Sequence, residues 1–207
     1  MYHNQESHTP RQASRYAFYM NLGIAVAEAA IGFFTGNVGF YADSAHNTAD
    51  AVGYGVTGSA MDAKPNRSRN LRRTSALILA AGGIATGVWA GVNAAEGHYE
   101  EANTVTILAA AGAAALNTKV SRKIHSAEHQ DDHSHEEHGA QLDAKLHGIL
   151  DSGTSWAYAG GLAAEHWVPG AANYVIVANG AISTIAAGVM IKRTLGPQQQ
   201  RSYGHQH

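Results

Sequence analysis

The sequence contains no cysteine, only 4 proline residues and few charged residues. The absence of cysteine excludes a disulfide-bonded scaffold, thiolate metal sites and a cysteine nucleophile. Charged residues make up 14% of the chain, whereas soluble domains average about 25%. The net charge of −2 gives no global basic field, which argues against a nucleic-acid-binding function.

The few charges are unevenly distributed and leave long stretches with almost none. As helices, six stretches of about 20 residues are each long enough to cross a hydrocarbon core of about 30 Å. They lie near residues 16–36, 39–61, 75–95, 103–121, 144–164 and 171–191. Most are rich in Ala and Gly, whose small side chains allow helices to pack closely in a bilayer. This composition, together with polar ends, explains a mean hydropathy of only −0.20.

The sign of the charge alternates from one connecting segment to the next. All 14 Lys and Arg residues lie in the N-terminal segment, the 62–74 segment, the 119–145 segment or the C-terminal end. The connections near 36–39, 96–102 and 165–170 contain neither Lys nor Arg, and the last two contain Glu. This positive-inside pattern predicts an all-α integral membrane bundle of six transmembrane helices with both termini in the cytoplasm. A soluble Ala-rich helical bundle would explain the stretches but not the alternation.

The same pattern predicts how the chain is organised. We expect a cytoplasmic N-terminal segment over 1–15, a transmembrane domain over 16–193 with a His-rich cytoplasmic loop near 124–143, and a short cytoplasmic tail over 194–207. Residues 1–15 are polar and show no apolar core of a signal peptide. The expected location is a bacterial-type plasma (inner) membrane, crossed several times.

Two pairs of ionisable residues lie inside the expected spans, where each such residue costs about 2.5–3.5 kcal/mol on insertion scales. His46 and Asp50 are four residues apart in the second span, and His147 and Asp151 repeat this spacing in the fifth. Residues four apart share one helix face. If the two spans pack together, the pairs offer two nitrogen and two carboxylate oxygen ligands, which suits tetrahedral Zn²⁺, with Co²⁺ or Cd²⁺ as alternatives. A His–Asp hydrogen bond within each helix would also satisfy these groups.

Three other polar residues in the first two spans have a less defined role. Asp43 lies one helical turn before His46, and we expect it to support the ligands or the packing. Glu28 is a candidate proton carrier, although an interhelical hydrogen bond would explain it equally well. Asn47 is grouped with them as a residue behind the ligands or on a proton path.

These residues resemble the cation diffusion facilitator family of divalent-metal efflux transporters. The similar positions are Asn21, Glu28 and Gly32, then ADSAHNTAD at 42–50, Asn117, and AKLHGILDSGTS at 144–155. The resemblance implies that His46, Asp50, His147 and Asp151 are the ligands of the transport site. It also implies Zn²⁺ as the transported substrate, exchange of the metal for protons, and a homodimer. No prosthetic group is expected.

Two features depart from the family pattern. Only Thr194–His207 follow the last expected span, where family members usually have a metal-binding cytoplasmic domain that dimerises. Val168-Pro169 stands where the family usually has Asp-Pro. The dimer and its regulation depend on that cytoplasmic domain, whereas we expect transport itself to survive both departures.

The segment between the fourth and fifth spans is rich in His and carboxylates. Its histidines in 126–143 are His129, His133, His135 and His138. Such a composition cannot form a core and predicts a disordered loop. Loose capture of divalent metal near the cytoplasmic mouth is one interpretation, and a solvated linker without function is the other.

The sequence is compatible with three functions. The first is a Zn²⁺ transporter driven by protons, because metal binding to imidazole and carboxylate displaces protons. The second is a membrane-anchored protein that buffers metal through its His-rich loop. The third, a membrane metalloenzyme, is disfavoured because four ligands leave no open position for water and no general base is evident. We therefore expect no enzymatic activity.

Overall fold

Six helices account for nearly all of the chain that the computed structural model describes, which is residues 9–97, 102–127 and 135–195. The helices are α1 (Pro10–Thr35), α2 (Val38–Met61), α3 (Pro65–Ala95), α4 (Thr104–Ser126), α5 (His135–Ala164) and α6 (Ala171–Leu195). Within these residues no strand is present, which confirms the all-α fold class.

Local sequence signals set several of the helix ends. Thr9 caps α1 in a capping box with Gln12, whose side chain accepts a hydrogen bond from the Thr9 backbone N–H. Gly36 ends α1 in the left-handed conformation (φ 68°), which glycine adopts at little cost. Asn37 follows at once and caps α2 by accepting from the backbone N–H of Phe40. This short connection makes α1 and α2 antiparallel neighbours.

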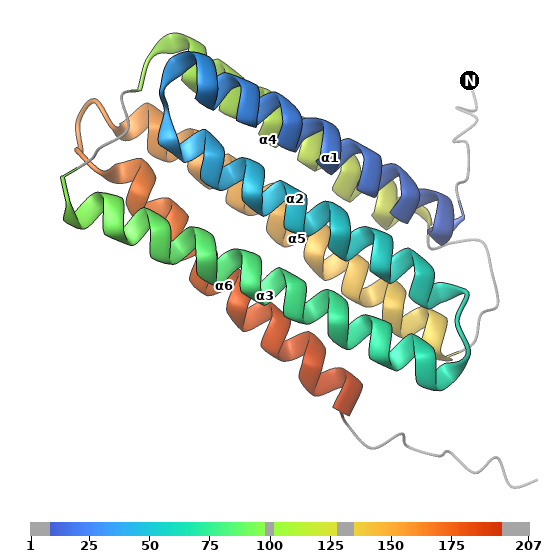
Figure 1. The fold of residues 1–207 in the computed structure, drawn as a ribbon. Coiled ribbons are helices and arrows are strands. Elements are labelled where there is room, and N and C mark those ends of the chain that lie inside the picture. Colours follow the sequence, from blue (N-terminus) through green and yellow to red (C-terminus); the bar gives the residue numbers. More distant parts are fainter. Residues whose placement is uncertain (1–8, 98–101, 128–134, 196–207) are drawn as a thin grey trace, which may run out of the picture.

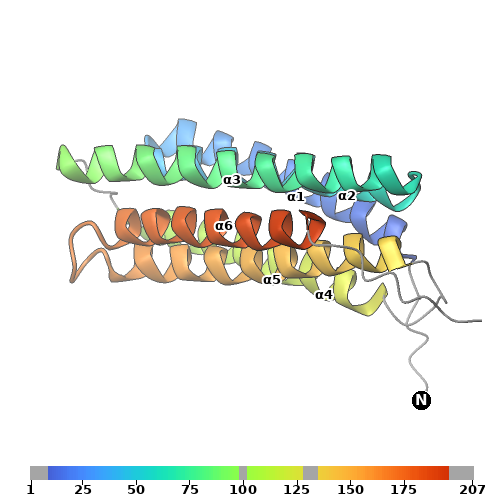
Figure 2. The same ribbon diagram turned by 90° about the horizontal axis from the view of Figure 1, so that it is seen from below.

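The helices form two layers of three that stack on each other (Figures 1 and 2). In one layer α2 lies between α1 and α3, and in the other α5 lies between α4 and α6. Across the layers α3 packs extensively on α6, α1 packs on α4, and α2 packs on α5. The two central helices, α2 and α5, carry the two His–Asp pairs, so the fold brings these pairs to the middle of the bundle.

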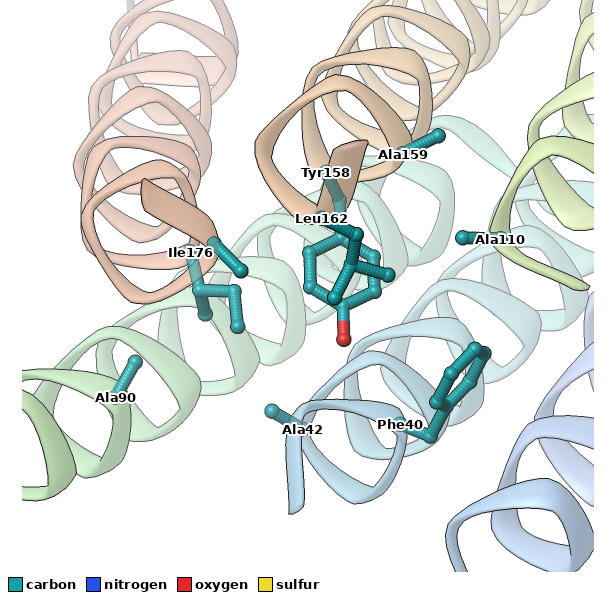
Figure 3. Packing of buried hydrophobic residues seen from close by; sticks show 9 residues of the cluster. Phe40, Ala42, Ala90, Ala110, Tyr158, Ala159, Leu162 and Ile176 are labelled. Carbon is teal, nitrogen blue, oxygen red and sulfur yellow. The ribbon is translucent and has the colours of Figure 1, made fainter. Parts of the chain in front are cut away.

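The alternating helices place the basic residues together. The start of α1, the α2–α3 connection, the end of α4, the start of α5 and the end of α6 all lie at one end of the bundle, here called the basic end. The opposite end, called the acidic end, contains the α3–α4 and α5–α6 connections. Near it, Phe40 and Tyr158 meet edge to face with ring centroids 6.1 Å apart, beside Leu162 and Ile176 (Figure 3).

The helices extend further toward the basic end than the charge pattern predicts. α3 begins at Pro65, so most of the basic 62–74 segment is helical and not a loop. α4 continues to Ser126 and α5 begins at His135, so the loop expected near 124–143 is helical at both of its ends. Charged residues set the limits of the apolar stretches in the sequence. Lys, Arg and Glu are good helix formers, so a helix can continue through them into the polar region beside the bilayer.

Three helices are long and apolar enough to cross a membrane by length and composition alone. Among the described residues these are Pro10–Thr35, Pro65–Asn93 and Ala171–Arg193. The other three, α2, α4 and α5, do not meet this criterion, and each of them contributes residues to the buried polar cluster.

Glycines bring α3 and α6 into very close contact. A Cβ atom added at Gly180 would collide with the carbonyl oxygen of Gly83 and lie 3.0 Å from the Cα of Gly87. The atoms that it meets belong to the backbone, so they have no rotamer into which to move. Close approach through small residues is the main source of helix association in a bilayer.

Gly180→Ala is therefore expected to destabilise the bundle by about 1–3 kcal/mol, the usual cost of overpacking. Unfolding of the detergent-solubilised protein, followed by circular dichroism, measures this. Gly188→Ala is the matched control, because a Cβ at Gly188 on the same helix meets nothing within 4 Å. Helix propensity favours Ala at Gly188 by up to about 1 kcal/mol. Equal stability of the two variants would contradict the close α3–α6 contact.

Candidate metal centre

Asp50 lies at the centre of the buried polar cluster, between two imidazole rings. His46 is one turn earlier on α2, and its Nε2 is 3.3 Å from Asp50 Oδ2. His147 reaches across from α5, and its Nε2 is 2.9 Å from Asp50 Oδ1. The Asp50 side chain is 0% exposed and that of His46 is 12% exposed. Each carboxylate oxygen of Asp50 thus has its own imidazole.

Asp151 completes the cluster from α5. One ligand atom each from His46, Asp50 and Asp151 lie within 4.8 Å of one another. His147 lies outside this closest group of three and joins it through Asp50. The structure therefore brings together the four residues that the sequence pairs indicate, two from α2 and two from α5.

Two buried carboxylates so close together repel each other unless a bound cation or a shared proton compensates their charge. Within the described residues, Oδ2 of Asp151 and both Asp50 oxygens receive no hydrogen bond of good geometry. The Nε2 atom of His147 also makes none. Buried polar atoms are nearly always satisfied, so unsatisfied atoms that converge from two helices are the pattern of a cation site.

An amide network holds the other face of Asp151. Asn117 on α4 donates from Nδ2 to Asp151 Oδ1 at 3.2 Å and to Ser155 Oγ at 2.8 Å. This bond occupies Oδ1 and leaves Oδ2 for the cluster. Asn117 and Ser155 are positions of the family resemblance, and the sequence by itself indicates no role for either of them at the site.

The network continues through Asn47 to Glu28 on α1. Asn47 Nδ2 donates to Glu28 Oε2 at 2.7 Å, and its Oδ1 lies 3.4 Å from the Asn117 Nδ2. Both Asn47 and Glu28 are buried. An interhelical hydrogen bond thus exists at Glu28, as one of its two interpretations requires. The four helices α1, α2, α4 and α5 are linked by one chain of polar side chains.

Asp43 lies on the acidic-end side of the cluster. It lines a small cavity of about 20 Å³ together with His46, and Thr86, Thr154 and Asn179 line it from α3, α5 and α6. Asn179 Nδ2 donates to the Thr154 backbone oxygen at 3.0 Å. The cavity gives His46 a polar surrounding toward the acidic end.

Tyr54 covers the cluster on the side toward the basic end. It is 1% exposed, and its ring centroid lies 4.5 Å from that of His147. Sequence analysis did not single out Tyr54. The sequence does indicate its position, because residues 46, 50 and 54 are spaced by four and therefore share one face of α2.

A second buried ion pair lies at the basic end. Arg72 on α3 reaches Asp143 on α5 through both Nε and Nη2, each 2.7 Å from Oδ2. Arg193 on α6 is 4.0 Å from the other oxygen of Asp143, whose side chain is 1% exposed. Sequence analysis assigned these arginines only a topological role, whereas the structure joins three helices through them.

The His-rich segment contributes nothing to the cluster that can be described. His129 and His133 lie outside the described residues. His135 and His138 belong to the first turns of α5, so their backbone lies at the basic end. Their side chains are outside the part of the chain that the structure describes. Metal capture by this segment stays a prediction.

The comparison with known families agrees with this geometry. The family of cation efflux transmembrane domains matches residues 14–196, which includes all of the polar cluster and nearly all of the six helices. A search of the curated proteins finds no match. The chain belongs to the cation efflux (cation diffusion facilitator) family and is an integral membrane protein that transports divalent metal cations.

Proposed function

We propose that this transporter exports Zn²⁺ from the cytoplasm in exchange for protons, and that His46, Asp50, His147 and Asp151 bind the metal during transport. The observation that supports this most directly is the position of Asp50 between two imidazoles, with Asp151 beside it. These groups supply two nitrogens and at least two carboxylate oxygens at one point in the centre of the bundle.

The donor set favours Zn²⁺ over other abundant divalent cations. Zn²⁺ prefers four ligands and accepts imidazole nitrogen with carboxylate oxygen. Ca²⁺ takes 6–8 oxygen ligands and Mg²⁺ needs octahedral oxygen, so neither suits a site with two histidines. Co²⁺ and Cd²⁺ accept similar ligands and are expected as weaker substrates or competitors. The chain has no cysteine, which argues against Cu⁺.

Exchange for protons follows from the ligand chemistry. An imidazole binds metal only in its neutral form, so protons and Zn²⁺ compete for His46 and His147. The basic end faces the cytoplasm according to the positive-inside rule, so release occurs toward the acidic end, where Asp43 and the small cavity adjoin His46.

Purified protein in vesicles that contain a zinc-sensitive dye tests this proposal. We expect Zn²⁺ uptake that accelerates when the vesicle interior is more acidic than the medium, and that slows when a protonophore collapses the gradient. Mg²⁺ and Ca²⁺ should not compete. Uptake that is independent of the gradient would contradict proton exchange. Equilibrium Zn²⁺ binding without any uptake would instead indicate a metal-buffering protein.

A further inference from the structure

A second cavity lies between the start of α1 and the end of α2, and none of the four proposed metal ligands lines it. Its volume is about 240 Å³, and it is at the basic end of the bundle. Its walls include Arg11, Arg15, Phe18 and Tyr19 from α1, Ser59 from α2, and Asp62, which caps the end of α2. None of these residues takes part in the polar cluster around Asp50.

The charged wall of this cavity is positive. Arg11 Nε is 3.1 Å from Asp62 Oδ2, and both side chains are more than half exposed. Arg15, one helical turn further along the same face of α1, has no ion-pair partner among the residues that the structure describes. Two guanidinium groups and one carboxylate leave a net charge of +1, so the cavity repels divalent cations and attracts an anion.

The wall that lies deeper in the membrane is aromatic. Phe18 and Tyr19 follow Arg15 by one turn, and their rings meet edge to face with centroids 5.0 Å apart. Tyr19 is 65% exposed, and Phe18 lies against α2 where a Cβ at Gly55 would be 3.2 Å from its ring. From the basic end toward the bilayer centre, the cavity therefore changes from cationic to aromatic, which is the order of polarity along a phospholipid molecule.

We propose that this cavity binds an anionic phospholipid, with its phosphate at Arg15 and Arg11 and its acyl chains along Phe18 and Tyr19. Guanidinium groups bind phosphate through strong charge-assisted hydrogen bonds, and each basic residue near an anionic bilayer surface adds to the attraction. Tyr54 lines the same cavity, and its ring packs on His147. One side chain thus contacts both the lipid site and the metal centre.

Native mass spectrometry of the full chain, titrated with phosphatidylglycerol or phosphatidylcholine, tests the proposal without any transport measurement. We expect the protein to bind phosphatidylglycerol more tightly than phosphatidylcholine. Arg15→Gln should weaken phosphatidylglycerol binding by about fivefold, because it removes one of the two guanidinium groups that contact the phosphate. Asp62→Asn should strengthen it, because it frees Arg11 from its carboxylate partner.

Arg67→Gln is the matched control, since Arg67 is also exposed at the basic end but does not line the cavity. The proposal is overturned if Arg15→Gln and Arg67→Gln weaken binding equally, because the attraction would then be a general surface effect. It is also overturned if inorganic phosphate at millimolar concentration displaces the lipid, because the site would then recognise the free anion. The opposite shift expected for Asp62→Asn keeps the test valid if Arg15→Gln folds poorly.

Discussion

Asp50→Asn is expected to abolish metal transport and to weaken Zn²⁺ binding by more than about 100-fold, since even residues that only orient metal ligands are worth 10–100-fold. Asp50 contacts both imidazoles and lies beside Asp151, so its side chain adjoins all three of the other proposed ligands. Asparagine preserves the shape of the side chain but removes its negative charge. Any loss therefore reports the chemistry of the ligand and not a cavity in the bundle.

Two measurements are needed to interpret this variant. Calorimetric titration with Zn²⁺ measures binding, and the dye-loaded vesicles measure uptake. Thr48→Ala is the matched control, because Thr48 is exposed on the same helix and bonds only to the Ser44 backbone oxygen. Near-normal uptake by Asp50→Asn would exclude Asp50 as a ligand. Normal binding with no uptake would instead place its role in the conformational change.

The sequence alone could predict the number of helices because charge separates the apolar stretches. In this chain the charged residues gather between these stretches and their sign alternates with each crossing, which predicts six helices that run in alternating directions. The exact bounds could not be predicted in the same way. Polar residues continue for several turns into α3 and α5, where the ion pair between Arg72 and Asp143 joins the two helices.

The two His–Asp pairs of the polar cluster could be predicted because a spacing of four fixes a shared helix face without any tertiary information. The stacking of α2 on α5 could not be read from either helix separately. For the same reason the sequence could not show that Asp50 lies between both imidazoles, or that Asn117 binds one oxygen of Asp151. Such contacts join residues on different helices, and only the packed bundle defines them.

Among single substitutions outside the metal centre, Arg72→Gln, which breaks the Arg72–Asp143 ion pair, is expected to cause the largest loss of stability. Arg72→Gln leaves the Asp143 carboxylate buried at 1% exposure, with only Arg193 at 4.0 Å from its other oxygen. Removing one partner of a buried ion pair costs about 3–5 kcal/mol, because the remaining charge loses its compensation. The partial contact with Arg193 places the expected loss toward the lower value.

The double variant Arg72→Gln/Asp143→Asn separates the cost of an unpaired charge from a simple loss of contact. If the unpaired carboxylate causes the loss, neutralising it should restore most of the stability, so the double variant should unfold closer to the wild type than Arg72→Gln does. Arg67→Gln, an exposed arginine in the same part of α3, serves as the control. Thermal unfolding in detergent measures all four proteins. If the double variant is less stable than Arg72→Gln, the pair stabilises the α3–α5 contact through its own geometry, and the unpaired charge is not the cause.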